Sequence, residues 1–349
     1  MLWRRKEARR APGMTSEGVL GANDRLDRAA GRKVPRPGAL CVAADGRLLL
    51  SSGTSVLALA AWDAEPERWA TFDAPVTALA ASPGGRIAVG LAGGGLSVRD
   101  PDGSAEGGWD GPNGLASITD CLFLSEREVA LVDCGYGPED DILSRAPWDD
   151  DAGGKVVAVG HDGGARLLAE GLHCPMGLCR AADGTLIATE LERARLIDIP
   201  GGAVRRSGFP GYLGRIRPAP GGYLLACLAR RDPLIEFLKT ETAFVADMKA
   251  AIDPHHWISP RIDPAFSHDF PIELGATRLF GEVKPWAPSF SYGLVIELDA
   301  EMMPIASAHS RANGHRHAIT DILCWRGDLI AVSAGSGELL NLGPGSAAA

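Results

Sequence analysis

Two histidines near the C-terminus have a spacing that suits acid–base chemistry. In the stretch "GHRHAIT", His315 and His317 stand two residues apart. Alternate side chains of a β-strand share one face, so both imidazoles would point to the same side. Histidine gains and loses a proton near neutral pH. We therefore take His317 as a candidate general base and His315 as a candidate ligand contact.

A second histidine-rich stretch, "DPHHWISPRIDPAFSHDF", begins at Asp253 and holds His255, His256 and His268. Adjacent histidines rarely bind one metal, and no helical i, i+4 pair is present, so the spacing does not predict a zinc site. The prolines favour a rim loop or lid instead. Lids of this kind cover the mouths of binding sites, and Trp257 would anchor this one and contact the ligand.

Cysteine usage favours a reducing environment. The chain has seven cysteines, an odd number, and most of them fall in apolar, strand-like segments. Cys174 and Cys179 are five positions apart, which is not the spacing of a zinc knuckle. We expect buried free thiols, a cytoplasmic location, no metal site and no cofactor.

Charge and hydropathy limit the classes of molecule that the protein could bind. The net charge of −9 argues against a nucleic acid or an anionic membrane surface as partner. The longest apolar run, "VLALAAW", is too short to span a bilayer. A small-molecule ligand is the expected partner, and a protein partner stays open.

The elements that must position these residues repeat along the chain. The stretch "CPMGLCRAADGTLIATELERARLIDI" reads as two apolar strands around an Asp-Gly turn. One hairpin cannot stand alone in water. Similar hairpins begin near six positions: Pro37, Pro75, Ser117, Cys174, Tyr212 and His317. Spacings of about 40 residues predict an all-β, six-bladed β-propeller. A β-sandwich is the alternative, although it does not require a repeated motif.

The remaining segments do not repeat. Residues 1–33 are polar and charged, and we expect a partly disordered tail there; residues 344–349 form a second flexible tail. The propeller would span residues 34–343 as a single domain, with an insertion at about 232–290 in a late blade. Within the insertion, Leu234, Leu238, Val245, Met248 and Ile252 recur at helical spacing and predict one helix.

Part of the chain resembles a known family. The motifs "GLHCPMGL", "TELERARLI" and "FPGYLGRI" stand in the order and spacing of motifs in the strictosidine-synthase-like proteins. The resemblance covers residues 153–228 well and continues more weakly into the last repeat. It implies a six-bladed propeller related to the SMP-30, gluconolactonase and paraoxonase group. One such scaffold supports many reactions, so the fold alone does not identify an activity.

The resemblance also implies where a metal ion would lie. The metal-dependent relatives hold a calcium-type ion on the axis through carboxylate and amide oxygens, which such hard cations require. The family's ligand positions fall here on Gly38, Ile118 or Thr119, Met176, Gly214 and Arg215. None of these side chains is a carboxylate or an amide. We therefore expect the family's metal site to be lost, with Arg215 and Met176 contacting the ligand instead.

The catalytic glutamate of strictosidine synthase aligns with Thr320. Threonine has no useful acid–base pKa, so true strictosidine synthase activity is not expected. The carboxylate of Asp120 is next to the family's ligand position at Ile118 or Thr119.

Two hypotheses about function follow. The first is a metal-independent hydrolase, lactonase or condensing enzyme that uses His317 as base, Arg215 as anion or oxyanion stabiliser, and Asp120 or Thr320 as orienting groups. The alternative is a non-catalytic propeller with a degenerate active site that binds a ligand or a protein.

Overall fold

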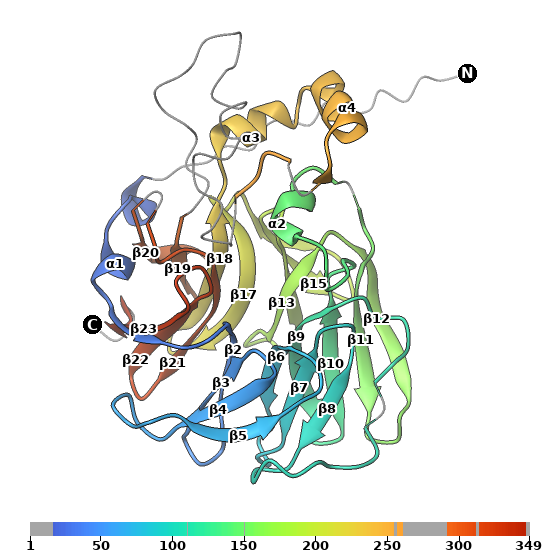
Figure 1. Ribbon diagram of the computed structural model, residues 1–349, viewed down its shortest axis with the longest axis vertical. Coiled ribbons are helices and arrows are strands. Elements are labelled where there is room, and N and C mark those ends of the chain that lie inside the picture. The colour runs from blue at the N-terminus through green and yellow to red at the C-terminus, as the bar shows by residue number, and fades with distance from the viewer. Residues whose placement is uncertain are drawn as a thin grey trace.

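The computed structural model describes residues 17–109, 111–149, 151–254, 257–260, 292–311 and 314–346. Six antiparallel sheets surround a common axis, as Figure 1 shows. The inner strands β2, β6, β9, β13, β17 and β21 form a ring in which each contacts the next and β21 returns to β2. The prediction of a six-bladed, all-β propeller is confirmed.

The blades follow one another along the chain. Blade 1 contains β2 (Pro37–Val42), β3 (Leu48–Ser52), β4 (Ser55–Leu59) and β5 (Glu67–Thr71). Blade 2 contains β6 (Val76–Ala81), β7 (Ile87–Leu91) and β8 (Leu96–Arg99). Blade 3 contains β9 (Ile118–Ser125), β10 (Glu128–Asp133), β11 (Gly154–Gly160) and β12 (Ala165–Leu172).

The second half of the ring is built in the same way. Blade 4 contains β13 (Pro175–Arg180), β14 (Leu186–Glu190), β15 (Arg195–Ile199) and β16 (Val204–Ser207). Blade 5 contains β17 (Gly211–Ala219), β18 (Gly222–Arg230), β19 (Leu294–Asp299) and β20 (Pro304–His309). Blade 6 contains β21 (Ile319–Trp325), β22 (Asp328–Ser333), β23 (Glu338–Pro344) and β1 (Ala30–Lys33).

Blade 6 joins the two ends of the described chain. β1 pairs with β23 in an antiparallel register that places Ala30 opposite Asn341. Of the segment 1–33, for which we expected a tail, the structure describes residues 17–33; these include η1 (Gly18–Leu20) and α1 (Arg25–Arg28) as well as β1. The hydrogen bonds between β1 and β23 link residues 30–33 to residues 338–341, so this non-covalent pairing closes the ring of blades.

The repeated turns depend on glycines in a left-handed backbone conformation. Gly46, Gly85, Gly184 and Gly327 adopt positive φ in the tight turns between the first two strands of their blades. In blade 5 the corresponding residue is Gly221 rather than the expected Gly222. Only glycine takes this conformation without steric cost. The strands on either side of each turn are therefore held in register, and their apolar faces pack between neighbouring blades.

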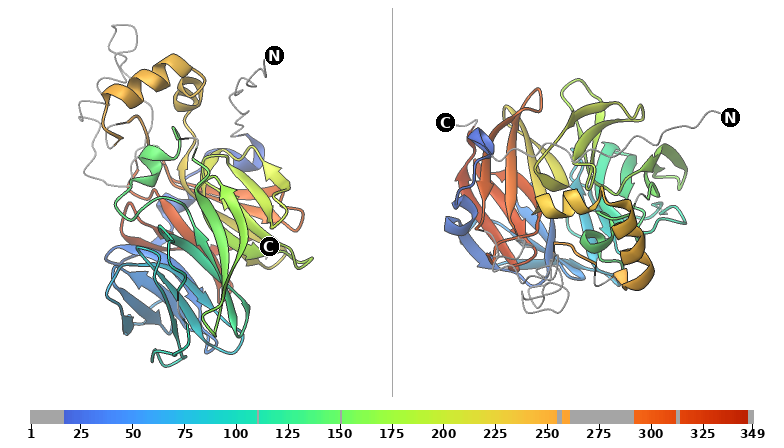
Figure 2. Two further views of the ribbon diagram at one scale, coloured as in Figure 1. Left: turned by 90° about the vertical axis from the view of Figure 1, so that its right-hand side faces the viewer. Right: turned by 90° about the horizontal axis from the view of Figure 1, so that it is seen from above.

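The insertion after β18 forms two helices, where one was predicted. α3 (Pro233–Leu238) begins after the N-cap Asp232, and α4 (Thr242–Ala251) follows a short break. Thr240 ends the first helix because both its amide and its hydroxyl bond to the carbonyl of Phe237. Both helices project beyond the sheets on the same side as α2 (Ile142–Arg145), as Figure 2 shows. No helix in the described ranges is long and apolar enough to cross a membrane.

Candidate functional site

Each inner strand carries an irregularity at the same level around the axis. The pairing of the inner strand with its neighbour skips residues at this level in all six blades. The skipped residues are Gly38 and Ala39, Thr77, Thr119, Met176, Gly214 and Arg215, and Thr320. A β-bulge leaves the extra residue outside the hydrogen-bonded ladder. The bulges thus make backbone carbonyls available at the axis.

Arg215 occupies the centre of this ring. Its Nη1 donates to the carbonyl oxygens of Gly38, at 3.0 Å, and Thr320, at 2.9 Å. Its Nη2 donates to the carbonyl of Thr119 at 2.7 Å and to that of Thr77. A guanidinium group carries four terminal N–H bonds. All four are therefore used by carbonyls from four different blades.

A second arginine, two residues further along β17, completes a buried charge cluster. Arg217 donates two hydrogen bonds to Asp120, at 2.8 and 2.9 Å, and one to Asp321 at 2.9 Å. The Nε of Arg215 lies 3.6 Å from Asp120 and 3.8 Å from Asp321. Both carboxylates are fully buried. Two positive and two negative charges balance, and we call these four residues the axial quartet.

The quartet also holds backbone groups of neighbouring blades. Asp120 accepts from the amide of Leu178 in blade 4 at 2.9 Å, and Asp321 accepts from the amide of Leu40 in blade 1 at 3.0 Å. Buried charges are tolerated when they are paired and hydrogen-bonded, and both conditions hold here. The quartet and its partners therefore connect all six blades at the axis.

Above the quartet lies a cavity on the axis, which we call the mouth cavity. It has a volume of about 540 Å³. Arg215, Thr77, Thr119, Thr320 and Met176 lie at its floor. Its walls are mostly apolar and include Pro37, Pro75, Val76, Ile118, Ile142, Leu143 and Leu228. Small-molecule sites are concave and mainly apolar, with a few polar groups, and the mouth cavity has these properties.

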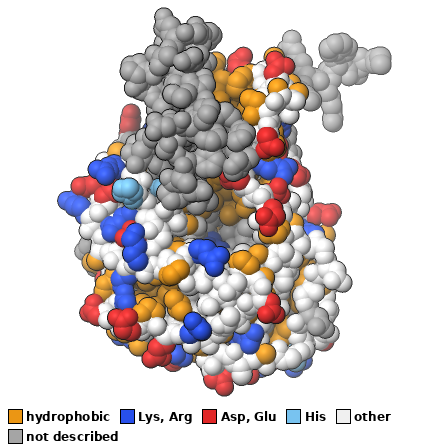
Figure 3. Space-filling model, viewed as in Figure 1, with side chains coloured by type: hydrophobic (Ala, Val, Ile, Leu, Met, Phe, Trp, Pro, Cys, Tyr) orange, Lys and Arg blue, Asp and Glu red, His pale blue; other side chains and the backbone are white. Residues whose placement is uncertain are grey.

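Among the described residues, three charged side chains line the mouth cavity besides Arg215: Arg36, Asp140 and Asp141. Asp140 pairs with Arg145, and Asp141 caps α2 by accepting from the amide of Ser144 at 3.2 Å. Within the described part of the chain, no carboxylate lies within ion-pair distance of the exposed Arg36. Acidic and basic side chains are otherwise intermingled on the face that Figure 3 shows. Arg36 is therefore the cationic donor that the mouth cavity offers to a ligand.

A second cavity of about 330 Å³ lies around the opposite end of the inner strands. Arg217 lines it, together with Cys41, Cys121, Cys179 and Cys324. Because Arg215 lines the mouth cavity, the axial quartet separates the two. Burial raises the pKa of the Cys41 and Cys179 thiols to about 12, so both are neutral thiols at neutral pH.

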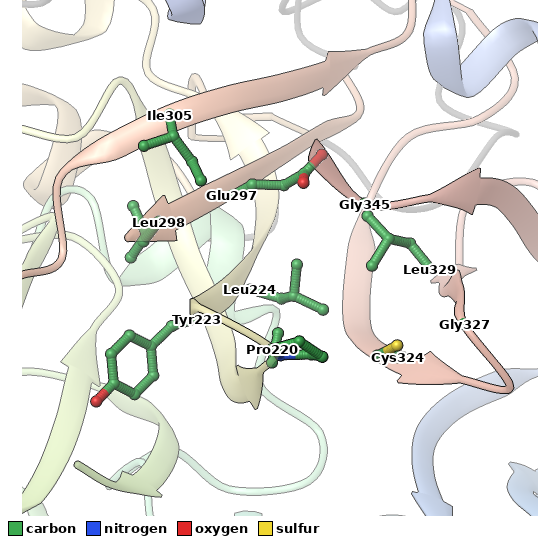
Figure 4. A pocket seen from close by; sticks show the side chains of 11 residues that line it. Pro220, Tyr223, Leu224, Glu297, Leu298, Ile305, Cys324, Gly327, Leu329 and Gly345 are labelled. Carbon is green, nitrogen blue, oxygen red and sulfur yellow. The ribbon is translucent and has the colours of Figure 1, made fainter. Parts of the chain in front are cut away.

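A third, smaller cavity of about 80 Å³ lies between blades 5 and 6. Figure 4 shows its lining, which is mostly apolar and includes Tyr223 and, at one side, Glu297. That carboxylate is already held by Arg25, at 2.6 Å, and by the amide of Ser346, at 2.6 Å. The mouth cavity is larger and is lined by three of the residues predicted for the site, Met176, Arg215 and Thr320, so it is the better candidate.

The structure brings some of the predicted site residues together and separates others. Arg215, Thr320 and Met176 line the mouth cavity, and Asp120 lies beneath it in the quartet. The Thr320 hydroxyl donates to the Gly38 carbonyl at 2.7 Å. This bond closes the junction between blades 6 and 1, and it directs the hydroxyl proton to the backbone.

The predicted histidines do not share a strand face, because both precede β21. His315 is exposed, whereas His317 is buried against Gly335, with its Nδ1 3.0 Å from the Gly314 carbonyl. His317 is not among the residues that line the mouth cavity.

The histidine-rich stretch is only partly described. Its Trp257 packs with Trp148, Ile235, Leu238 and Met248 beneath the insertion helices. His255, His256 and His268 lie outside the described residues.

Sequence reasoning missed Arg217 and the part that Asp321 plays beside it. A signal was present: blades 3 and 6, which face each other across the axis, both begin with Ile-Thr-Asp, at 118–120 and 319–321. Equal bulges place the two aspartates at equal height on opposite sides. A basic residue between them was therefore to be expected from the adjacent strands.

The axial residues do not fit the calcium-type ion that the resemblance implies. The five positions offer two glycines, an isoleucine or threonine, a methionine and an arginine, and the carbonyls that face the axis already accept from Arg215. A divalent cation would meet the fixed positive charge of a guanidinium, which does not deprotonate. Over the described ranges, no group of three or more histidine, cysteine or acidic side chains is placed to hold a metal.

Comparison with known proteins agrees with the fold. No protein-family model matches the sequence. No curated protein matches it either. A gluconolactonase from Xanthomonas campestris is similar in structure, with a TM-score of 0.54 and 13% identity over 95% of this chain and 94% of that one. A putative gluconolactonase has a TM-score of 0.53 and 12% identity, over 90% of this chain and 91% of that one. At these identities the likeness establishes the propeller fold.

Proposed function

We propose that this protein binds a small organic molecule in the mouth cavity and that it does so without a metal ion. The observation that supports the proposal most strongly is the use of Arg215. Its four terminal N–H groups bond to backbone carbonyls from four blades, directly below a cavity of about 540 Å³. The guanidinium thus takes the structural place of an axial cation, and the cavity above it keeps its volume for a ligand.

The lining indicates the chemical class of this ligand. Proline, valine, isoleucine and leucine side chains make up most of the wall, so the body of the ligand is apolar. Arg36 supplies at the rim a guanidinium that has no ion-pair partner among the described residues, whereas Asp140 and Asp141 already accept hydrogen bonds. An anionic or strongly accepting group, such as a carboxylate, would bind Arg36 through charge-assisted hydrogen bonds.

A non-catalytic site agrees best with the residues around the cavity. Arg215 has no terminal N–H left to stabilise an oxyanion, and the Thr320 hydroxyl donates to Gly38. Asp120 and Asp321 are fully buried below the floor and paired with Arg217. We still propose that the protein is related to the strictosidine-synthase-like proteins. We do not propose a condensation reaction, because Thr320 cannot act as the acid–base residue.

Hydrolysis of a lactone or ester is the second candidate. Two observations favour it: Asp140 and Asp141 line the mouth cavity, and the fold is similar to that of proteins described as gluconolactonases. A carboxylate offers about four lone-pair sites, so each aspartate retains capacity to orient or activate a water molecule. Catalysis would then proceed by general base assistance and without a metal ion.

A screen of cell metabolites for thermal stabilisation, performed in chelator, tests the primary proposal. A ligand at a hundred times its dissociation constant adds about 2.7 kcal/mol of stability. Arg36→Met should weaken binding of a stabilising anion roughly tenfold, since one charged hydrogen bond is worth about 1.5 kcal/mol. The exposed Arg180 provides the control variant, Arg180→Met. Absence of any stabilising metabolite, or binding that Arg36→Met leaves intact, would count against the proposal.

The same ligands and a panel of lactones separate binding from hydrolysis. A binding protein returns each compound unchanged. A hydrolase forms product, and Asp140→Asn or Asp141→Asn then lowers turnover about 100-fold or more, as loss of a general base does. Product formation that both variants leave unchanged would exclude these carboxylates as the base.

A further inference from the structure

Three sulfur atoms converge beside the mouth cavity, at the junction of blades 3 and 4. Cys134 directly follows β10, Cys174 directly precedes β13, and Met176 is the bulge residue of β13. The Sγ of Cys174 lies 3.9 Å from the Sδ of Met176. Cys134 and Cys174 belong to one buried cluster, and Met176 packs against it. Both cysteines are free and buried. The chain thus places two thiols and one thioether in one cluster beside the mouth cavity.

We propose that Cys134, Cys174 and Met176 form a binding site for one soft monovalent cation of the Cu(I) type. Thiolate and thioether sulfurs are the ligands that Cu(I) prefers, whereas hard cations require oxygen. Metal–thiolate bonds are about 2.3 Å long. Three sulfurs at that distance from a central ion in one plane are about 4 Å apart. The 3.9 Å separation of Cys174 and Met176 matches one edge of such a triangle.

The surroundings suit this ion in particular. Tyr136, Leu143, Leu191, Tyr212 and Leu228 pack around the two thiols and keep water away. The hydrogen bonds of the described residues give the Cys134 thiol one oxygen acceptor, the Tyr136 carbonyl at 3.6 Å. Zinc normally takes four ligands in a tetrahedron. Three sulfurs in an apolar shell therefore favour a three-coordinate soft ion over zinc.

A route to the site exists through Met176. This side chain is partly exposed and lines the mouth cavity, as do Leu143 and Leu228 from the surrounding shell. An ion that enters the mouth cavity reaches the thioether first and the two thiols behind it. Binding releases thiol protons to solvent, because the thiolate is the form that ligates metals. No electron transfer is involved.

An anaerobic titration of the reduced full-length protein with Cu(I), in competition with a chromophoric Cu(I) chelator, tests the site. We expect one tightly bound Cu(I) per chain and no comparable binding of Zn²⁺. Second-shell changes already weaken metal sites roughly 10- to 100-fold. Cys134→Ser and Cys174→Ser each remove a ligand and should cost at least as much. Cys324→Ser is the control, because Cys324 is the most accessible of the seven cysteines; it should leave the affinity unchanged.

Met176→Leu keeps the test decisive if the serine variants fail to fold. This exchange nearly conserves volume, so the fold is retained, and binding should weaken about tenfold or more. X-ray absorption of the copper-loaded protein should report an all-sulfur environment at about 2.3 Å. The proposal is overturned if wild-type protein binds no Cu(I), if Met176→Leu binds it equally well, or if nitrogen and oxygen ligands dominate the spectrum.

Discussion

Replacement of Arg215 by methionine probes the centre of the ring. The exchange keeps an unbranched side chain but removes the charge and every donor. Four backbone carbonyls, of Gly38, Thr77, Thr119 and Thr320, lose their partner. The axial quartet becomes a triad in which Arg217 alone faces two buried carboxylates.

The expected cost follows from these losses. Hydrogen bonds to charged groups contribute about 1.5–3 kcal/mol each, so four give an upper bound of roughly 6–12 kcal/mol. The carbonyls border the mouth cavity, and water entering there recovers part of this sum. Breaking a buried ion pair typically costs about 3–5 kcal/mol. We therefore expect Arg215→Met to lower the free energy of unfolding by about 3–5 kcal/mol, a large share of the stability of an ordinary domain.

Urea denaturation followed by circular dichroism measures this difference. Arg180→Met, an exposed arginine exchange, should change stability by less than about 0.5 kcal/mol. Arg215→Lys separates charge from geometry, because lysine keeps the charge but has three donors and no planar fork. It should fall between the wild-type protein and Arg215→Met. A stability loss for Arg215→Met no larger than that of the control would refute the central position of this side chain.

Three further predictions concern neighbouring groups. Gly177→Ala should cost about 1–3 kcal/mol by overpacking, since its Cβ would lie 2.7 Å from the backbone Cα of Arg215; Gly201→Ala, with open space around it, is the matched control. Thr189→Val should cost about 1–3 kcal/mol, because the fully buried hydroxyl donates to the Gly214 carbonyl at 2.7 Å; the exposed Thr71→Val should be neutral by the same urea assay. Burial, with Arg230 adding to it, lowers the pKa of His309 from 6.5 to about 4, so the unfolded chain binds the extra proton between these values. Stability should be complete above pH 6.5 and fall by about 2 kcal/mol towards pH 4.5; His309→Gln should flatten this dependence and His315→Gln should not.

The propeller could be predicted from the sequence because its blades are determined by the pattern of side chains. Apolar alternation and turn glycines repeat with each blade, and both act locally, so six hairpins were visible without any structure. The position of Arg215 at the axis also followed from the motif "FPGYLGRI". Its partners could not be foreseen in the same way. They are backbone carbonyls exposed by β-bulges. Every residue has a backbone carbonyl, so residue types do not indicate which carbonyls face the axis.

The histidines show the opposite case, in which a residue pattern suggested a site that the structure does not form. Their spacing fits a strand, but the strand begins only at Ile319, so alternation does not apply to His315 and His317. The histidines therefore indicated the position of the axial site less well than the repeated Ile-Thr-Asp triplets at 118–120 and 319–321, whose role is structural. Internal comparison of the repeats at the axial level would have found Asp120, Asp321 and the need for a bridging arginine.

We infer that the Arg215 guanidinium occupies the axial position at which the sequence resemblance implies a calcium-type ion. Equilibrium unfolding of metal-depleted wild-type protein, in chelator and in excess Ca²⁺, tests it most directly. We expect the two unfolding curves to coincide within about 0.5 kcal/mol, because Arg215 already bonds to the axial carbonyls. A stability that rises with Ca²⁺ concentration, by about 2.7 kcal/mol at a hundred times a dissociation constant, would contradict it.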